Sequence, residues 1–284
     1  MDISVIVPFY KGNAYMPQLF EVLRNNARNA LGLQIELLIV NDSPQCPVKY
    51  DPGWVEGFTL QILNNLENAG IQQTRVNGLR KASGEYIQFL DQDDTLEPDA
   101  LASQYALLGG YDLILANGYN ENKQASEPIY RTEKQLLLAA SPRFYYTVSN
   151  QIASPGQVLI RKEAIPQQWY ESCIGRNGSD DLLLWLMLFH RNARWKINPR
   201  CLYTHKDTGH NLSDDIGKMV ASSQEVLQVL QRFGMISALQ ARQFHSSRQM
   251  AAAYIGKSPL HKLLAMLLHP VITWNRFLLH LLSR

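Results

Sequence analysis

Ser-Gly-Glu-Tyr-Ile-Gln-Phe-Leu-Asp-Gln-Asp-Asp-Thr, residues 83–95, is the stretch from which the fold of this chain can be worked out. Its middle, residues 86–90, is apolar, follows a glycine and is too short for a helix, which indicates a buried strand. The strand ends in three carboxylates, Asp91, Asp93 and Asp94. Open α/β sheets bind ligands at the carboxyl ends of their strands. The acidic end is therefore either a metal or ligand site or a solvated turn.

Further apolar runs of the same kind lie on both sides of this stretch. They cover residues 3–7, 36–40, 57–63, 111–116 and 156–160. Segments with helical periodicity separate most of them, and further helices are expected over 136–140 and 182–189. Short strands that alternate with helices indicate right-handed βαβ units. We therefore expect an α/β fold with a mainly parallel sheet flanked by helices.

The composition is that of a globular chain with room for one α/β domain and an appendage. It has 284 residues, 46% hydrophobic and 18% charged, with a formal net charge of +2, so we expect no nucleic-acid partner. Beyond residue 215 the sequence becomes rich in Gln, Ala and Leu and poor in strand formers. This change predicts one α/β domain over 1–215 and a C-terminal helical extension over 216–284.

The cysteines and the N-terminus both favour a cytoplasmic protein. Three cysteines are widely spaced and show no metal-binding spacing, which is typical of reduced thiols. The sequence passes from Met1 directly into a strand, so we expect no secretory signal peptide.

Several short motifs occur in an order that resembles a known family. They are Val5–Tyr10, Ile39–Ser43, Arg75 with residues 78–87, and residues 90–94. Together they resemble the family 2 glycosyltransferases, the inverting enzymes of the Rossmann-like GT-A fold. The resemblance is strong over residues 1–95 and looser to about 213. It implies a nucleotide-sugar donor, usually a UDP-sugar, a divalent ion such as Mn²⁺ or Mg²⁺, and single displacement at the anomeric carbon of the sugar.

The resemblance also implies roles for residues that follow the first strands. Tyr10 would stack on uracil, Asp42 would accept the imide N–H of the base, and Arg75 would reach the base or a phosphate. Simpler interpretations remain open: a loop aromatic, an Asx turn and an exposed helical arginine. The full set of expected nucleotide-sugar-binding residues is Pro8, Tyr10, Asp42, Arg75, Asp91, Gln92, Asp180 and Trp185.

Residues 91–94 match the family's DxD-type metal signature. Carboxylate oxygens suit Mg²⁺ or Mn²⁺, and we expect Asp93 to bind the ion directly, with Asp91 and Asp94 supporting it. Family members often carry a histidine before an Asn-Leu-Ser-like ending. Here His205 and His210 both partly fit, so either is a candidate metal ligand.

Residues 179–185 resemble the family's Glu-Asp pair followed by a helix that carries a tryptophan. Asp180 stands where the family usually has Glu, and the resemblance assigns the catalytic base to Asp181, which would take the proton of the acceptor hydroxyl. Acids at a helix start also suit capping and the helix dipole. Trp185, one turn on, is either a core residue or a sugar platform.

The last segment, residues 257–284, alternates polar and apolar residues with helical spacing. Lys262, Pro270 and Arg276 disfavour a membrane-spanning helix. A basic amphipathic helix could lie on an anionic membrane with Trp274 near the headgroups, or it could pack on protein. The membrane interpretation predicts a location at the cytoplasmic face of the membrane.

These observations predict a metal-dependent inverting glycosyltransferase. It would move a sugar from a UDP-sugar to a hydroxyl of a glycan or lipid-linked glycan in the synthesis of surface polysaccharide. One alternative is a non-catalytic scaffold subunit that binds nucleotide sugars, which the departure at Asp180 leaves open. Another is a sugar-1-phosphate nucleotidyltransferase, but the loop over residues 8–13 has one glycine where such enzymes carry a Gly-rich loop.

Overall fold

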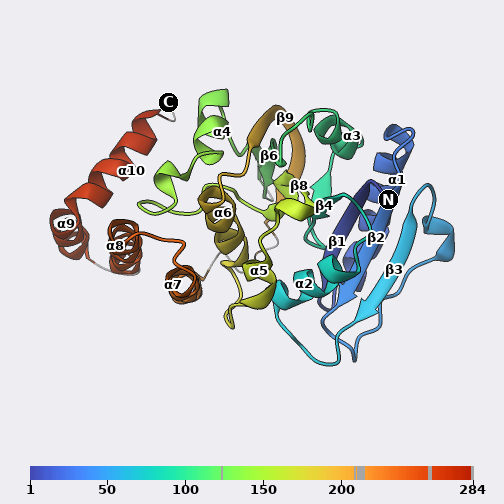
Figure 1. Cartoon of the computed structure of the whole chain (residues 1–284), viewed down its shortest axis with the longest axis horizontal. Coiled ribbons are helices and arrows are strands. Elements are labelled where there is room, and N and C mark those ends of the chain that lie inside the picture. The colour runs from blue at the N-terminus through green and yellow to red at the C-terminus, as the bar shows by residue number, and fades with distance from the viewer. Residues whose placement is uncertain (123, 208, 210–214, 255–257, 283–284) are drawn as a thin grey trace. The chain divides into compact units, whose positions relative to one another are not determined.

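The computed structural model describes residues 1–122, 124–207, 209, 215–254 and 258–282 (Figure 1). Within these ranges the chain divides into two compact units that interleave along the sequence. The sheet unit takes residues 1–129, 153–165 and 193–208, and the helical unit takes residues 130–152, 166–192 and 209–284. The division therefore differs from a single boundary near residue 215, because two earlier segments already belong to the helical unit.

The sheet unit is built on a nine-stranded sheet with the order β3-β2-β1-β4-β8-β6-β9-β5, and β7 pairs with β6. The first four strands are mutually parallel, whereas β8 is antiparallel to both of its neighbours and β6 and β9 are parallel. The expected parallel arrangement of the N-terminal strands is thus confirmed. The strands are β1 (Ile3–Phe9), β2 (Ile35–Asn41), β3 (Thr59–Asn64), β4 (Tyr86–Phe89), β5 (Thr95–Leu96), β6 (Leu113–Glu121), β7 (Ser126–Pro128), β8 (Val158–Arg161) and β9 (Trp195–Lys206).

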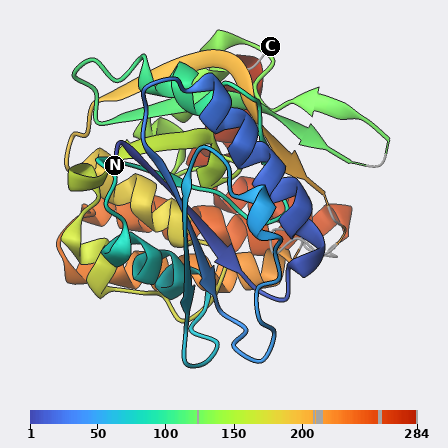
Figure 2. The same ribbon diagram turned by 90° about the vertical axis from the view of Figure 1, so that its right-hand side faces the viewer.

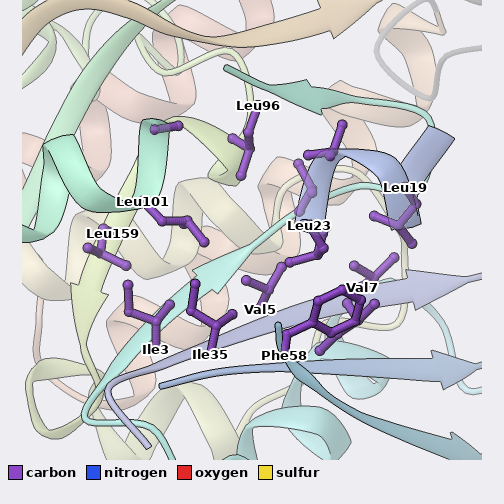
Figure 3. Packing of buried hydrophobic residues seen from close by; sticks show 14 of the residues in the cluster. Ile3, Val5, Val7, Leu19, Leu23, Ile35, Phe58, Leu96, Leu101 and Leu159 are labelled. Atoms are coloured by element: carbon purple, nitrogen blue, oxygen red, sulfur yellow. The ribbon is translucent and has the colours of Figure 1, made fainter. Parts of the chain in front are cut away.

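Both faces of the central strands are covered, which explains their continuous apolar sequences. Figure 2 shows α1 (Met16–Asn29) as a long blue helix beside the blue strands. Val5 and Val7 of β1 share a core cluster with Leu19 and Leu23 of α1 (Figure 3). Successive strand residues point to opposite faces, so Ile6 meets the other helix, α2 (Ile71–Lys81). A third helix, α3 (Ala100–Tyr105), and 3-10 turns at Asn13–Tyr15, Pro52–Trp54, Pro155–Gln157 and Lys162–Ala164 complete the described elements of this unit.

One buried carboxylate, that of Glu36 in β2, joins several elements of the sheet unit. Only 1% of Glu36 is exposed. Its Oε1 accepts hydrogen bonds from Ser4 Oγ at 2.5 Å, from the Ser83 amide at 2.6 Å and hydroxyl at 2.9 Å, and from the Gly84 amide at 3.2 Å. Its Oε2 accepts one from Gln61 Nε2 at 3.3 Å. Glu36 therefore holds β1, β3 and the turn before β4 together.

The helical unit contains the remaining helices. They are α4 (Glu133–Ala139), α5 (Gln167–Glu171), α6 (Asp180–His190), α7 (Ile216–Arg232), α8 (Ala238–Tyr254), α9 (Pro259–Leu268) and α10 (Pro270–Leu282), with a 3-10 turn at Pro142–Phe144. The single amphipathic helix expected over 257–284 is wrong in one respect. It is broken at His269, because Pro270 has no N–H to donate and its ring clashes with the preceding turn, so that a new helix begins there. No helix among the described residues has the length and apolar character needed to cross a bilayer.

Candidate active site

The loop after β1 and the acidic loop after β4 are joined by the side chain of Gln92. Its Oε1 accepts a hydrogen bond from the Tyr10 amide at 3.0 Å, and its Nε2 donates to the Tyr10 carbonyl at 3.2 Å. A Cβ on Gly12 would lie 2.0 Å from this Oε1, so the contact requires glycine there. Pro8 lies near the end of β1, and Tyr10 beyond it is 47% exposed. Gln92 thus positions the backbone of Tyr10 and leaves the aromatic ring accessible.

Asp42, which directly follows β2, is almost fully buried and organises a neighbouring loop. Its Oδ1 accepts hydrogen bonds from Asn65 Nδ2 and the Ala69 amide, both at 2.7 Å, and its Oδ2 accepts one from the Gly70 amide at 3.1 Å. The Asx interaction with Ser43 is made instead by Asn41, whose Oδ1 accepts from the Ser43 amide. A carboxylate offers about four acceptor positions, so Asp42 keeps capacity for one more donor.

A depression of about 310 Å³ adjoins this loop. It is lined by Asn64, Asn65, Leu66, Glu67, Ala69 and Asn77. Its volume is at the lower end of the range for small-molecule sites. Asn65 and Ala69 contact both the depression and Asp42, so the carboxylate shapes its wall.

Arg75 is not the exposed helical arginine that its position in α2 would allow. Only 3% of its side chain is exposed, and Nη2 lies 2.5 Å from Asp91 Oδ1. This ion pair fixes the first acid of the 91–94 loop against α2. The expected contact of Arg75 with a base or phosphate stays a prediction.

Asp94, the last acid of the loop, is held by β9. Its carboxylate accepts hydrogen bonds from the Tyr203 hydroxyl and, at 3.0 Å, from the Lys206 amide, and its Oδ1 lies 3.2 Å from His205 Nδ1. Burial raises the pKa of Asp94, and the hydrogen bond with Asp94 raises the pKa of His205. His205 therefore contacts an acid of the loop. His210, the other candidate, lies outside the described residues.

Asp93 differs from its two neighbours because no side-chain donor to its carboxylate is found among the described residues. Burial raises its pKa to about 6, and the charges of Asp94 and Asp91 add to the effect. In the described part of the chain, no three His, Cys, Asp or Glu side chains converge as a protein-only metal site requires. Mg²⁺ commonly binds one or two carboxylates and takes its other ligands from phosphates and water. Asp93 fits that pattern, since its carboxylate has no side-chain donor among the described residues and lies close to the charges of Asp91 and Asp94.

The raised pKa of Asp93 predicts a cost in stability. Folding disfavours the charged form, so stability is lost as the pH rises from the ordinary value of 3.8 through about 6. Asp93→Asn should stabilise the metal-free protein by about 1–2 kcal/mol at pH 7.5. This is less than the free energy that corresponds to the whole pKa shift, because the residue is partly solvated. The gain should shrink as the pH is lowered to about 5.

Urea unfolding in the presence of a chelator measures this effect. Asp99→Asn is the matched control, because the Arg200 hydrogen bond lowers the pKa of Asp99 and that substitution should not stabilise. A destabilised Asp93→Asn protein at pH 7.5 would contradict the prediction.

In the helical unit, the expected pair of acids begins α6, as the sequence predicted. Asp181 Oδ2 accepts a hydrogen bond from Asn150 Nδ2 at 2.7 Å, and its Oδ1 accepts one from the Leu182 amide at 2.7 Å. The Asp180 carbonyl accepts a hydrogen bond from Trp169 Nε1 at 3.0 Å. These contacts fix the start of the helix and the orientation of the Asp181 carboxylate.

Trp185 has no exposed surface. A sugar platform must present a ring face, so of the two interpretations for Trp185 the structure supports the core residue. Asp180 is also almost fully buried, whereas Asp181 retains a small exposed fraction.

Sequence reasoning missed three residues that hold candidate side chains in place, two in the sheet unit and one in the helical unit. Gly12 makes room for Gln92, Tyr203 holds Asp94, and Asn150 holds Asp181. A glycine in a loop, a tyrosine in a strand and an asparagine in an irregular segment gave no signal in a single sequence.

The sequence of this chain is similar to a family model and to proteins named as glycosyltransferases. A family model described as "Glycosyl transferase family 2" matches residues 4–169, which is 166 of the 284 residues. An uncharacterized glycosyltransferase of Haemophilus influenzae is 24% identical over 89% of this chain and 83% of its own length. A putative glycosyltransferase of Bacillus subtilis, EpsH, is 30% identical over 121 residues, and the match spans 40% of this chain and 33% of EpsH.

Solved structures share the fold at lower identity. Residues 1–349 of Staphylococcus aureus TarS, in complex with UDP-GlcNAc, superpose with a TM-score of 0.63 at 16% identity, over 88% of this chain and 73% of that one. The Pyrobaculum calidifontis mannosyltransferase PcManGT, in complex with GDP-Man and Mn²⁺, gives a TM-score of 0.55 at 15% identity, over 99% and 85%. The architecture is thus the expected α/β GT-A fold with additional C-terminal helices. Because the family model covers more than half of its length, the chain belongs to glycosyl transferase family 2 and is a glycosyltransferase.

Proposed function

We propose that the protein is a metal-dependent inverting glycosyltransferase that uses a UDP-sugar. The observation that carries the proposal is the grouping of three features at the carboxyl ends of parallel strands: the exposed ring of Tyr10, the buried carboxylate of Asp42 and the acidic loop at 91–94. Ligands bind open α/β sheets at this edge. The UDP-GlcNAc complex of TarS and the GDP-Man and Mn²⁺ complex of PcManGT are consistent with nucleotide-sugar binding by this fold.

In this proposal the base of the donor is recognised by Tyr10 and Asp42. The exposed Tyr10 ring stacks on uracil, and the remaining acceptor position of Asp42 takes the imide N–H, a donor that cytosine lacks. Gln92 contributes indirectly, because it fixes the Tyr10 backbone. Pro8 and Arg75 complete the binding region.

A divalent ion would be held by Asp93, with Asp91 and Asp94 kept in place by Arg75 and by β9. When bound, Mn²⁺ or Mg²⁺ stabilises the negative charge that develops on the diphosphate leaving group. His205 acts through Asp94, which it contacts. The separate pairing of Asp91 and Asp94 leaves Asp93 as the acid that is available for a ligand.

Asp181 serves as the general base for the acceptor. Its carboxylate takes the proton of the acceptor hydroxyl while the hydroxyl oxygen attacks the anomeric carbon. The bond from that carbon to the UDP oxygen breaks, and the configuration at the anomeric carbon is inverted. The bond from Asn150 and the start of α6 hold the carboxylate in one orientation. The acceptor is a hydroxyl of a glycan or lipid-linked glycan of bacterial surface polysaccharide, at the cytoplasmic face of the membrane.

Release of the nucleoside diphosphate from a panel of UDP-, GDP- and CDP-sugars, with Mn²⁺ and with chelator, tests this function. The expected result is release from a UDP-sugar that requires the ion and rises when a lipid-linked glycan is added. Calorimetry with UDP alone gives an independent measure of binding. Metal-dependent UDP binding without turnover across acceptors would favour a scaffold subunit. Preference for a CDP-sugar would contradict the assignment of Asp42, because cytosine lacks the N–H that this carboxylate would accept.

A further inference from the structure

The helices α9 and α10 carry an apolar surface that their own unit does not bury. The C-terminal apolar surface, as we name it, is formed by large side chains that are each exposed by more than a third: Leu260, Leu263, Leu264, Met266, Leu267, Leu268, Val271, Trp274, Phe277 and Leu281. Leu268 is 75% exposed and Trp274 61%. Elsewhere in the described chain, exposed large apolar residues are scattered, which is ordinary for a protein surface. Ten exposed apolar side chains within 22 consecutive residues are unusual, and such concentrations mark surfaces that bind a protein or a membrane.

The other side of these two helices is already packed. Ala265 of α9 and Ile272 of α10 are buried with Met250 of α8 in a small core cluster, which Ala253 borders. Figure 1 shows α8, α9 and α10 in succession at the red end of the chain. The two helices therefore have a fixed inner side, and the outward residues are not needed for that core.

The charge of this region has one sign. Residues 226–284 contain seven Lys or Arg and no Asp or Glu, so their formal charge is +7, and residues 1–225 then carry +2 − 7 = −5. Arg248 of α8 lies near enough to Arg276 of α10 for the two guanidinium groups to repel. Burial and this repulsion lower the pKa of Arg248 to about 10, and its Nε is buried without an acceptor. The region brings cations together and supplies no carboxylate of its own.

These charges favour one kind of partner for the apolar surface. A symmetric contact with a second copy would place the same cationic segment on both sides, and like charges face each other at a cost. A bilayer with anionic lipids offers both hydrocarbon for the Leu, Trp and Phe side chains and negative headgroups for Lys262 and the guanidinium groups. Trp274 and Phe277 lie together, with ring centroids 5.7 Å apart, and tryptophan prefers the headgroup level.

We propose that the C-terminal apolar surface inserts into the interface of an anionic phospholipid bilayer, with α9 and α10 lying in the membrane plane. This inference rests on the proposed function, which places the protein at the membrane, and adds which surface binds and to which class of lipid. Its test measures binding without catalysis, so either proposal can fail while the other stands.

Co-sedimentation of the full chain with vesicles provides the test. Vesicles of phosphatidylcholine alone are compared with vesicles in which about one third of the lipid is phosphatidylglycerol. We expect binding to the anionic vesicles that weakens steeply with added salt. The double variant Trp274→Ala/Phe277→Ala should lose at least about tenfold in vesicle affinity, because insertion scales with buried apolar area. Lys262→Gln should weaken binding to anionic vesicles only.

The matched control is Leu31→Ala/Leu66→Ala, which removes two apolar side chains at least as exposed, from the sheet unit. It should bind vesicles as the parent does, and circular dichroism should show that all variants are folded. Equal affinity of the Trp274/Phe277 variant and the control would overturn the proposal. An absence of vesicle binding would also overturn it. Self-association in sedimentation velocity, or capture of an acidic protein, would then identify another occupant of the surface.

Discussion

Asp181→Asn is expected to lower the turnover of sugar transfer by about 10²- to 10⁴-fold and to leave UDP binding nearly unchanged. The substitution keeps the size of the side chain. Its single amide oxygen can still accept the hydrogen bond from Asn150, while the one from the Leu182 amide is lost. It removes the basic oxygen that would take the acceptor proton. Because Asp181 is proposed to act on the acceptor, the loss should appear in transfer and not in the affinity for UDP. Initial rates with saturating donor, together with calorimetry of UDP, measure the two effects.

Asp180→Asn is the informative companion to this variant. The Asp180 side chain is more deeply buried than that of Asp181, so its substitution should act mainly through the local fold. Asp99→Asn, at an exposed ion pair with Arg200, is the neutral control. If Asp181→Asn lost UDP binding and transfer together, or lost neither, the assignment of the base would fail. Inactivity of Asp180→Asn beside an active Asp181→Asn would move the base by one residue.

Glu36→Leu is expected to destabilise the protein by about 3–5 kcal/mol. The leucine would remove the acceptor for the Ser4, Ser83 and Gln61 side chains and for two backbone amides of the turn before β4. Buried donors that lose their acceptor cost about 1–3 kcal/mol each, and relaxation recovers part of that sum. Urea denaturation followed by circular dichroism gives the change in free energy of unfolding.

Glu56→Leu is the matched control for this effect. Glu56 forms an ion pair with Arg28 in which both side chains are more than half exposed, and such pairs contribute at most about 1 kcal/mol. A similar loss of stability in the two variants would show that the Glu36 network has no special role. Ser83→Ala, which removes one hydroxyl donor, should fall between the control and Glu36→Leu.

The three central strands β1, β2 and β4 could be predicted from sequence because they are buried on both faces. Residues 3–7, 36–40 and 86–90 are nearly continuous apolar runs for that reason, and each ends where the polar site residues begin. β9 (Trp195–Lys206) could not be predicted in this way. It contains a proline, mixes buried with exposed positions and pairs with β6 through register shifts. A local pattern cannot reveal such a strand, which depends on a distant partner.

The residues of the candidate site also fall into those that could be predicted from sequence and those that could not. Tyr10, Asp42 and residues 91–94 follow strong strands, so their grouping could be inferred from the sequence. The partners that orient them, such as Tyr203 for Asp94 and Asn150 for Asp181, are remote or lie in irregular segments. The helix break at Pro270 was accessible from sequence, since proline cannot continue a helix from its preceding turn.

The place of β9 in the sheet has a consequence for how the protein is made on the ribosome. β1 to β4 are complete at residue 89. Among the described strands, β1, β2 and β3 pair only within this group, whereas β4 also pairs with β8. Among the described strands, β5 pairs only with β9, which ends at residue 206. At about 5–20 residues per second, the 117 residues between 89 and 206 take about 6–23 seconds to synthesise. During that time Asp94 lacks Tyr203, His205 and Lys206. The parallel strands at the edge proposed to bind the donor are therefore synthesised before the residues that hold the acidic loop.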